Sequence, residues 1–288
     1  FVVDRGKLMS FKGIYAALSG SLAQALKIDT IANNIANVNT TGFKKDQQTF
    51  GEYLTSMEKN ADPVTSLPRN PASMENMNST SLMDKSFVDS TGTHTNFEQG
   101  SLKHTAGKLD VALDGEGFFE VATSTGTRLT RAGNFTIDNN GRLVTKDGNT
   151  VVVSPDGQDL SGADIDTKRN SFAQFSGNSQ PYISDGGEVF DGERRLGKLS
   201  IVKVNNLESL HKVGNSYYDF KPNMNPEMTT LNNPSLKQGY LETSNVNIVA
   251  EMTDMIKAQR VFEGTQKAIQ AYDQMQDKAI NQVGSTKA

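Results

Sequence analysis

Two stretches of helical periodicity, one near each end of the chain, constrain its fold more than any other feature. In each stretch, small or apolar residues recur at alternating spacings of three and four, which places them on one narrow stripe of a helix, as in a coiled coil. The first stripe comprises Ile14, Leu18, Ser21, Ala25, Ile28, Ala32 and Ile35, and the second comprises Met255, Ala258, Phe262, Thr265, Ile269 and Tyr272. The sequence between the stripes is strand-like. We therefore expect an α+β fold in which paired N- and C-terminal helices flank a central antiparallel β domain.

An asparagine-rich turn follows the first helical stretch. It comprises Asn33, Asn34, Asn37 and Asn39, followed by Gly42 and Phe43. Asparagine is a poor residue for a helix interior and forms local side-chain hydrogen bonds, while glycine readily adopts left-handed backbone at a helix end. We expect the helix to end near Ala36 and the chain to turn through a crowded polar joint that requires positive φ at Gly42. A merely polar helix end is the simpler alternative.

Short alternating runs separated by Asx–Gly pairs predict antiparallel hairpins in the middle of the chain. Candidate strands lie at 109–113, 118–121, 127–131, 134–137, 142–146, 150–154, 196–204 and 216–220. Asn140–Gly141 and Asp147–Gly148 separate neighbouring runs, and such pairs are the strongest local signal for a hairpin turn. The expected interior residues are Phe118, Phe119, Val121 and Phe135. We expect this region to fold independently of the helices.

These patterns divide the chain into four predicted parts. A helix and turn occupy 10–46, an extended arm 47–96, a β domain 97–240 and a final helix 241–284. Residues 155–193 inside the β domain are polar and glycine-rich, so they are interpreted as an insertion with few strands. The arm has little periodicity of either kind, which indicates a functional arm or a segment that becomes ordered on assembly.

Composition excludes several classes of partner and site. The net charge of −4 gives no electrostatic reason to expect nucleic acid. The uncharged stretch 13–26 is too short to span a bilayer, so we expect no direct membrane insertion. The absence of cysteine excludes disulfides and thiolate metal sites. The first eight residues are too short and polar for a signal peptide, and Met9 is a candidate original start.

Catalytic and metal-binding patterns are weak. His94, His104 and His211 are not spaced as metal ligands on one helix, so we expect no metal and no cofactor. The acidic residues between 110 and 120 could supply the two carboxylates of a glycoside hydrolase, but acids are common at turns and on alternating strand positions. We therefore expect no catalytic residue and no enzyme. A peptidoglycan-acting hydrolase and a soluble adaptor remain as alternatives.

Three blocks of the chain resemble one known family. GIYAALSGSLAQALKIDTIANNIANVNTTGFKKD (13–46) and YLETSNVNIVAEMTDMIKAQRVFEGTQKAIQAYD (240–273) are similar to the terminal signatures of the bacterial flagellar basal-body rod and hook proteins. The block FEQGSLKHTAGKLDVALDGEGFFEVATSTGTRLTRAGNFTIDNNGRLVTKDGN (97–149) resembles the β module shared by that family. The three blocks occur in the family's order, and ANNIANVNTTGFK alone is highly specific.

The resemblance implies a structural subunit that polymerises helically through its terminal helices into a tubular drive shaft that transmits torque. The opening GIYAALSG and the ending QKAIQAYDQMQDKAINQVG are most similar to the proximal-rod type next to the distal rod, with a distal-rod subunit as the alternative. The implied partners are copies of the chain, neighbouring proximal- and distal-rod subunits and the flagellar type III export apparatus. The implied location is the basal body, in the periplasmic span of the rod. The helical stripes would then form the assembly seam, and the helices would fold fully only against neighbouring subunits.

Overall fold

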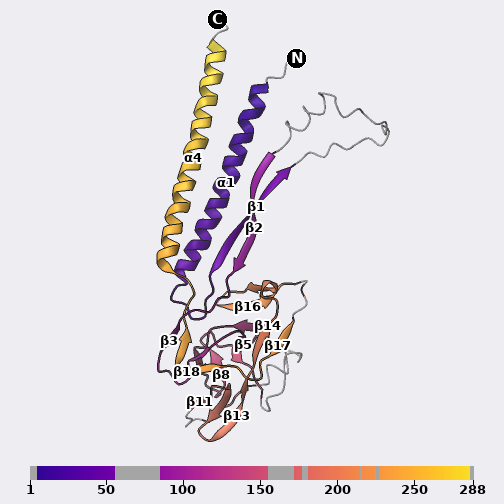
Figure 1. Ribbon diagram of the computed structural model, residues 1–288, viewed down its shortest axis with the longest axis vertical. Coiled ribbons are helices and arrows are strands. Elements are labelled where there is room, and N and C mark those ends of the chain that lie inside the picture. Colours follow the sequence, from indigo (N-terminus) through magenta and orange to yellow (C-terminus); the bar gives the residue numbers. More distant parts are fainter. Residues whose placement is uncertain are drawn as a thin grey trace, which may run out of the picture. The chain divides into compact units, whose positions relative to one another are not determined.

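The computed structural model describes residues 5–55, 85–154, 172–176, 181–214, 216–222, 224 and 227–285. The chain forms two compact units (Figure 1). Unit 1 comprises residues 1–32, 47–94 and 249–288, and unit 2 comprises residues 33–46 and 95–248. Terminal helices and a central antiparallel β region confirm the expected α+β fold.

Unit 1 contains two long antiparallel helices, α1 (Arg5–Ala36) and α4 (Ile248–Ser285). They pair closely enough that a methyl group added to Gly13 would lie 3.5 Å from the Tyr272 hydroxyl. Ala23 and Ile31 of α1 and Ala258 of α4 are buried. Each helix therefore buries one face, as the helical periodicity predicts.

A two-stranded ribbon completes unit 1. Strands β1 (Asp46–Thr55) and β2 (Lys85–Thr95) pair, and the Thr49 hydroxyl donates to the Gly92 carbonyl at 2.9 Å. A ribbon of two strands is marginally stable alone, and here a hydrogen bond from Thr30 of α1 to Gln48 of β1 (3.3 Å) ties it to the helix. The segment 47–96 thus contains strands at both of its ends, while 56–84 lies outside the described residues.

Unit 2 is built from short strands. They are β3 (Leu102–His104), β4 (Val111–Leu113), β5 (Phe118–Thr123), β6 (Gly126–Thr130), β7 (Phe135–Ile137), β8 (Leu143–Thr145), β9 (Thr150–Val151), β10 (Val153–Ser154), β11 (Pro181–Ile183), β12 (Glu188–Asp191), β13 (Arg194–Leu199), β14 (Ile201–Val204), β15 (Leu210–Lys212), β16 (Tyr217–Phe220), β17 (Met228–Thr230), β18 (Leu236–Gln238) and β19 (Tyr240–Glu242). A single turn of 3₁₀ helix, Leu207–Ser209, precedes β15. The candidate strands of the sequence analysis lie within two residues of the observed ends. Two of the candidates are each divided into two strands of different sheets: 150–154 contains β9 and β10, and 196–204 contains β13 and β14.

The largest sheet has the order β15-β16-β6-β5-β9-β8-β7, and β14 and β17 join it through β5. A four-stranded sheet has the order β10-β13-β12-β11. Two further pairs, β18 with β4 and β19 with β3, join segments that lie far apart in the sequence. All of these pairs are antiparallel, so the hairpin prediction is confirmed.

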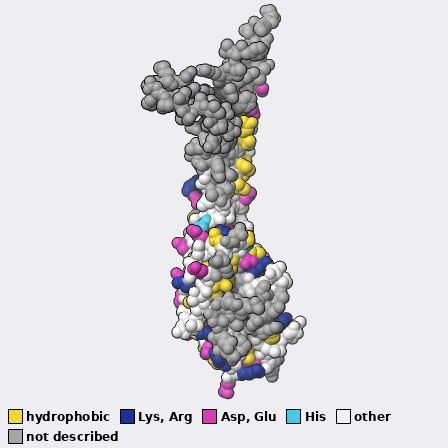
Figure 2. All heavy atoms as spheres, turned by 90° about the vertical axis from the view of Figure 1, so that its right-hand side faces the viewer, with side chains coloured by type: hydrophobic (Ala, Val, Ile, Leu, Met, Phe, Trp, Pro, Cys, Tyr) yellow, Lys and Arg dark blue, Asp and Glu magenta, His cyan; other side chains and the backbone are white. Residues whose placement is uncertain are grey.

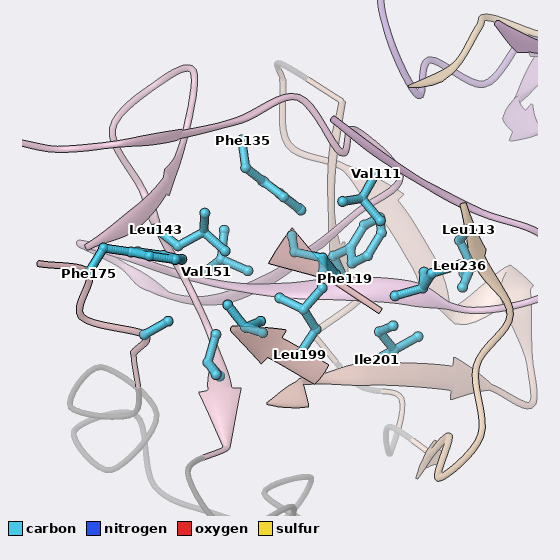
Figure 3. Close-up of a cluster of buried hydrophobic side chains, with 14 residues drawn as sticks. Val111, Leu113, Phe119, Phe135, Leu143, Val151, Phe175, Leu199, Ile201 and Leu236 are labelled. Carbon is cyan, nitrogen blue, oxygen red and sulfur yellow. The ribbon is translucent and has the colours of Figure 1, made fainter. Parts of the chain in front are cut away.

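Strand β5 separates two hydrophobic clusters, because successive side chains of a strand point to opposite faces. Phe119 belongs to the larger cluster and meets Phe135 edge-to-face at a centroid distance of 5.3 Å (Figure 3). Phe118 belongs to the other cluster, with Tyr218 at 5.7 Å. Val121 is also fully buried, so the four expected interior residues are confirmed.

Within the region 155–193, the strands β11 and β12 join the four-stranded sheet, while 155–171 and 177–180 lie outside the described residues. The start of the final helix differs from the sequence expectation. The final helix begins at Ile248 because Tyr240–Glu242 forms β19 and pairs with Leu102–His104. Helical periodicity could not reveal that pairing, which depends on a distant segment.

Candidate functional site

The predicted seam residues differ in how far they are exposed to solvent. Half-buried or buried seam residues are Ile14, Ala25, Ile28, Met255, Ala258, Phe262 and Ile269. Leu18, Ala32 and Tyr272 are exposed. Ile35 is half-buried in unit 2, in the last turn of α1. The predicted seam therefore includes residues that are packed within the chain and residues that are exposed to solvent.

A second apolar stripe on α1 is exposed to solvent. Tyr15, Leu18, Leu22 and Leu26 follow each other at spacings of three and four, and Leu18 and Leu22 are 54% and 62% exposed. Sequence periodicity assigned Leu18 to the seam and missed the other three residues, because apolar positions on both faces of α1 follow helical spacing. Contiguous exposed apolar residues of this kind mark an interaction surface.

Helix α4 carries a corresponding exposed stripe near its start. Val249, Met252 and Ile256 are 70%, 48% and 51% exposed and recur at spacings of three and four. Figure 2 shows hydrophobic side chains aligned in a column along the helical part of the molecule. The two terminal helices thus expose apolar stripes in addition to the face that each buries.

In unit 2 the asparagine-rich turn is held by side-chain hydrogen bonds. Asn34 is buried, and its amide donates to the Asp46 carbonyl (2.8 Å) and accepts from the Asp46 N–H (3.0 Å). The Asn37 amide donates to the Asn33 carbonyl at 2.9 Å, whereas Asn39 is exposed. The Asn34 side chain thus joins the end of α1 to the start of β1.

Gly42 and Phe43 lie at the centre of this joint. Gly42 has φ +67° and donates its N–H to the Glu242 carbonyl at 2.9 Å. The Phe43 side chain is buried, and the Lys212 ammonium lies 3.9 Å from the centre of its ring. The same ammonium pairs with the Asp46 carboxylate at 2.7 Å. Positive φ at Gly42 is thus present, as the sequence predicts.

A buried ionic cluster lies beside Gly42. The Lys44 ammonium is 2.5 Å from Oε1 of Glu242, and the Arg131 guanidinium is 3.4 Å from Oε2 of the same carboxylate. Lys44 and Glu242 are each 1% exposed, and Arg131 is 5% exposed. Burial lowers the pKa of Lys44 and of Arg131, and the Glu242 carboxylate opposes both shifts. The sequence analysis did not single out these residues, because nothing local indicates that they meet.

The acidic residues between 110 and 120 are engaged in structural contacts. Asp114 pairs with Lys237 at 2.7 Å, and this partner lowers the pKa of the Asp114 carboxyl. Glu116 pairs with Lys203 at 2.5 Å, while the buried Glu120 accepts a hydrogen bond from Ser200. Within the described residues no group of three or more His, Asp or Glu side chains is arranged to hold a metal ion. No described helix is long and apolar enough to cross a membrane.

Comparison with known proteins identifies related sequences over most of the chain. The sequence model of the flagella basal body rod protein matches residues 14–44, that of the flagellar hook protein FlgE/F/G D1 domain matches 112–189, and that of the flagellar basal body rod FlgEFG protein C-terminal region matches 237–282. The chain is 33% identical to the flagellar basal-body rod protein FlgG of Bacillus subtilis, across 94% of this chain and 98% of that protein. It is 31% identical to the flagellar basal-body rod protein FlgF of Caulobacter vibrioides, across 94% and 97%.

Proposed function

The chain belongs to the flagellar basal-body rod protein family, and we propose that it is a subunit of the proximal rod that polymerises helically into the tubular drive shaft. It is a structural protein, not an enzyme. Its partners are copies of itself and neighbouring proximal- and distal-rod subunits, and the flagellar type III apparatus exports it. It works in the basal body, in the periplasmic span of the rod.

The exposed apolar stripe of α1 carries this proposal. Tyr15, Leu18, Leu22 and Leu26 leave apolar surface in water that a neighbouring molecule would cover. The stripe of α4, with Val249, Met252 and Ile256, is a different surface. A contact between two different surfaces of identical chains does not close into a dimer, and it propagates as a helix when the rotation between neighbours does not close a ring.

The predicted seam and turn have separate roles in this proposal. The half-buried seam residues hold α1 and α4 together within one subunit, while the exposed stripes contact neighbours. The turn residues Gly42 and Phe43 hold the last turn of α1 in unit 2. Exposed seam members such as Leu18 and Tyr272 contribute to contacts between subunits.

Substitution of Leu22 by glutamate tests the stripe. Leu22→Glu places a charge where a neighbour would bury it, so we expect at least about a tenfold loss of polymer in sedimentation at rising concentration, alone or with adjacent rod subunits. Leu22 is 62% exposed, so the monomer should keep its circular dichroism spectrum. Ala16→Glu is the matched control, because Ala16 is exposed on α1 but lies off the stripe. Equal polymerisation of Leu22→Glu and wild type would refute the proposed contact.

A distal-rod subunit is the second candidate, since relatives of two different names match almost equally well, at 33% and 31% identity. Electron microscopy of basal bodies that carry a tagged copy distinguishes the two positions. A tag next to the hook would favour the distal rod, and one closer to the inner membrane would favour the proximal rod.

A further inference from the structure

The carboxylate of Glu242 joins three segments of the chain that are far apart in sequence. Lys44 comes from the block 13–46, Arg131 from the block 97–149 and Glu242 from the block 240–273. Oε1 of Glu242 accepts from Lys44 at 2.5 Å and from the Gly100 N–H at 2.9 Å, while Arg131 approaches Oε2 at 3.4 Å. The three blocks that carry the family resemblance therefore meet at one side chain.

Both cations of the cluster also donate to distant backbone carbonyls. The Lys44 ammonium donates to the Glu98 carbonyl at 2.7 Å, and the Arg131 guanidinium donates to the Gly115 carbonyl at 2.8 Å. Both cations and the carboxylate are almost completely removed from water. A buried charge is tolerated only while its partners are in place, and removal of one partner leaves an uncompensated charge.

Backbone contacts tie the same segments together beside the cluster. The Gly42 N–H donates to the Glu242 carbonyl at 2.9 Å, and the Lys45 N–H donates to Asn245 Oδ1 at 2.7 Å. The Asn245 amide in turn donates to the Asn96 carbonyl at 2.9 Å. The Gly42 and Lys45 N–H groups of the segment 33–46 thus find their acceptors in the segment 240–246.

We propose that the Lys44–Glu242–Arg131 cluster is a closure lock: the segments 33–46 and 240–246 dock on the rest of unit 2 together or not at all. Docking of the segment 33–46 alone would bury Lys44 without its anion, and docking of the segment 240–246 alone would leave Glu242 with Arg131 but without Lys44. Each segment therefore raises the other's docking affinity by the same factor, as linkage requires. The lock therefore fixes the last turn of α1 and the residues that precede α4 only when both segments are docked.

The lock acts within one chain and does not require polymerisation. The proposed lock would therefore remain valid if the proposed role in the rod were refuted. It assigns a role to Glu242 that the exposed stripes do not have, because the stripes contact neighbours while the lock acts within one chain. The experiment that tests it therefore uses the full-length monomer.

Amide hydrogen exchange of two single variants measures the coupling. Lys44→Met removes the ammonium group from the segment 33–46. Glu242→Gln removes the negative charge of the carboxylate from the segment 240–246. We expect each variant to accelerate exchange by about tenfold or more in both segments, 33–46 and 240–246. Exchange in the core strands β5 and β14 should not change. Glu116→Gln is the matched control, since Glu116 also pairs with a lysine in unit 2 but is 76% exposed at its side chain, and it should change neither segment.

The reciprocal effect is the decisive result. The lock is refuted if each variant accelerates exchange only in its own segment, if neither changes exchange, or if exchange rises uniformly and includes β5 and β14. Asn245→Ala is a milder test of the coupling between the two segments. It removes the hydrogen bonds to Lys45 and Asn96 but leaves no buried charge without its partner. It should accelerate both segments by a smaller factor, and an effect on 240–246 alone would also refute the lock.

Discussion

At Gly42 two independent constraints exclude any side chain. The backbone has φ +67°, in the left-handed region that favours glycine. An added methyl group would also lie 2.4 Å from the Ala132 nitrogen and 2.5 Å from the Arg131 carbonyl carbon. Because both contacts are with backbone, a rotamer change cannot relieve them. The glycine therefore lets the turn approach the backbone of Arg131 and Ala132, directly after β6.

We expect Gly42→Ala to lower the free energy of unfolding by about 2–4 kcal/mol, since positive φ in alanine and the backbone overlap both add cost. Thermal or denaturant unfolding of unit 2 measures this loss. Gly192→Ala is the matched control: Gly192 has φ +64°, but no described atom lies within 4 Å of the added methyl group. The control should lose only about 1–2 kcal/mol. Equal losses would show that close packing at Gly42 is not required.

The residues of the joint show how far local sequence can predict a site. Asparagine and glycine after the helix predicted a polar turn with positive φ, because both preferences are intrinsic to the residue. The partners of Asn34 and the ionic cluster could not be predicted. Lys44 and Glu242 are 198 residues apart in sequence, and a buried ion pair leaves no local pattern in either segment. Such a contact follows from the fold and not from residue preference.

At the scale of elements, hairpins were easier to predict than long-range strand pairs. Asp147–Gly148 lies between β8 and β9, which pair as neighbours in the sequence. Strands β3 and β4 instead pair with β19 and β18, which lie more than one hundred residues further along the chain. The helices were predicted from periodicity, but the start of α4 was not, because β19 takes the residues before it.

Helix α1 contains a glycine that weakens it without a visible packing role. A methyl group added to Gly20 would meet no described atom within 4 Å. Alanine favours a helix over glycine by about 1 kcal/mol. We therefore expect Gly20→Ala to increase the helical circular dichroism of the dilute monomer and to stabilise α1 by up to about 1 kcal/mol. Gly264→Ala should act similarly in α4, where the added methyl group also meets no described atom. Unchanged helicity in both variants would show that the helices are already fully formed.

At the scale of the whole molecule, the two units bury very different shares of their surface. Unit 2 contains three hydrophobic clusters whose strands β5, β8 and β14 are fully or largely buried. In α4, by contrast, Glu251 and Ala258 alone are buried among the described side chains. Ordering each residue costs conformational entropy. A helix that buries so few side chains gains little hydrophobic free energy to offset that cost. The helices therefore depend on additional partners to a degree that unit 2 does not.

This difference predicts that folding of the helices is coupled to assembly. Helices α1 and α4 would account for roughly a quarter of the chain if both were complete, and isolated helices are marginal in water. We expect far-UV circular dichroism of the dilute monomer to show clearly less helix than this, and to rise to the full value on polymerisation. The near-UV signal from the tyrosines and phenylalanines of unit 2 should not change. Leu22→Glu supplies the control, because under the same conditions it should neither polymerise nor gain helix. A dilute monomer that already shows the full helical signal would contradict coupled folding while leaving the proposed contacts between subunits to be tested separately.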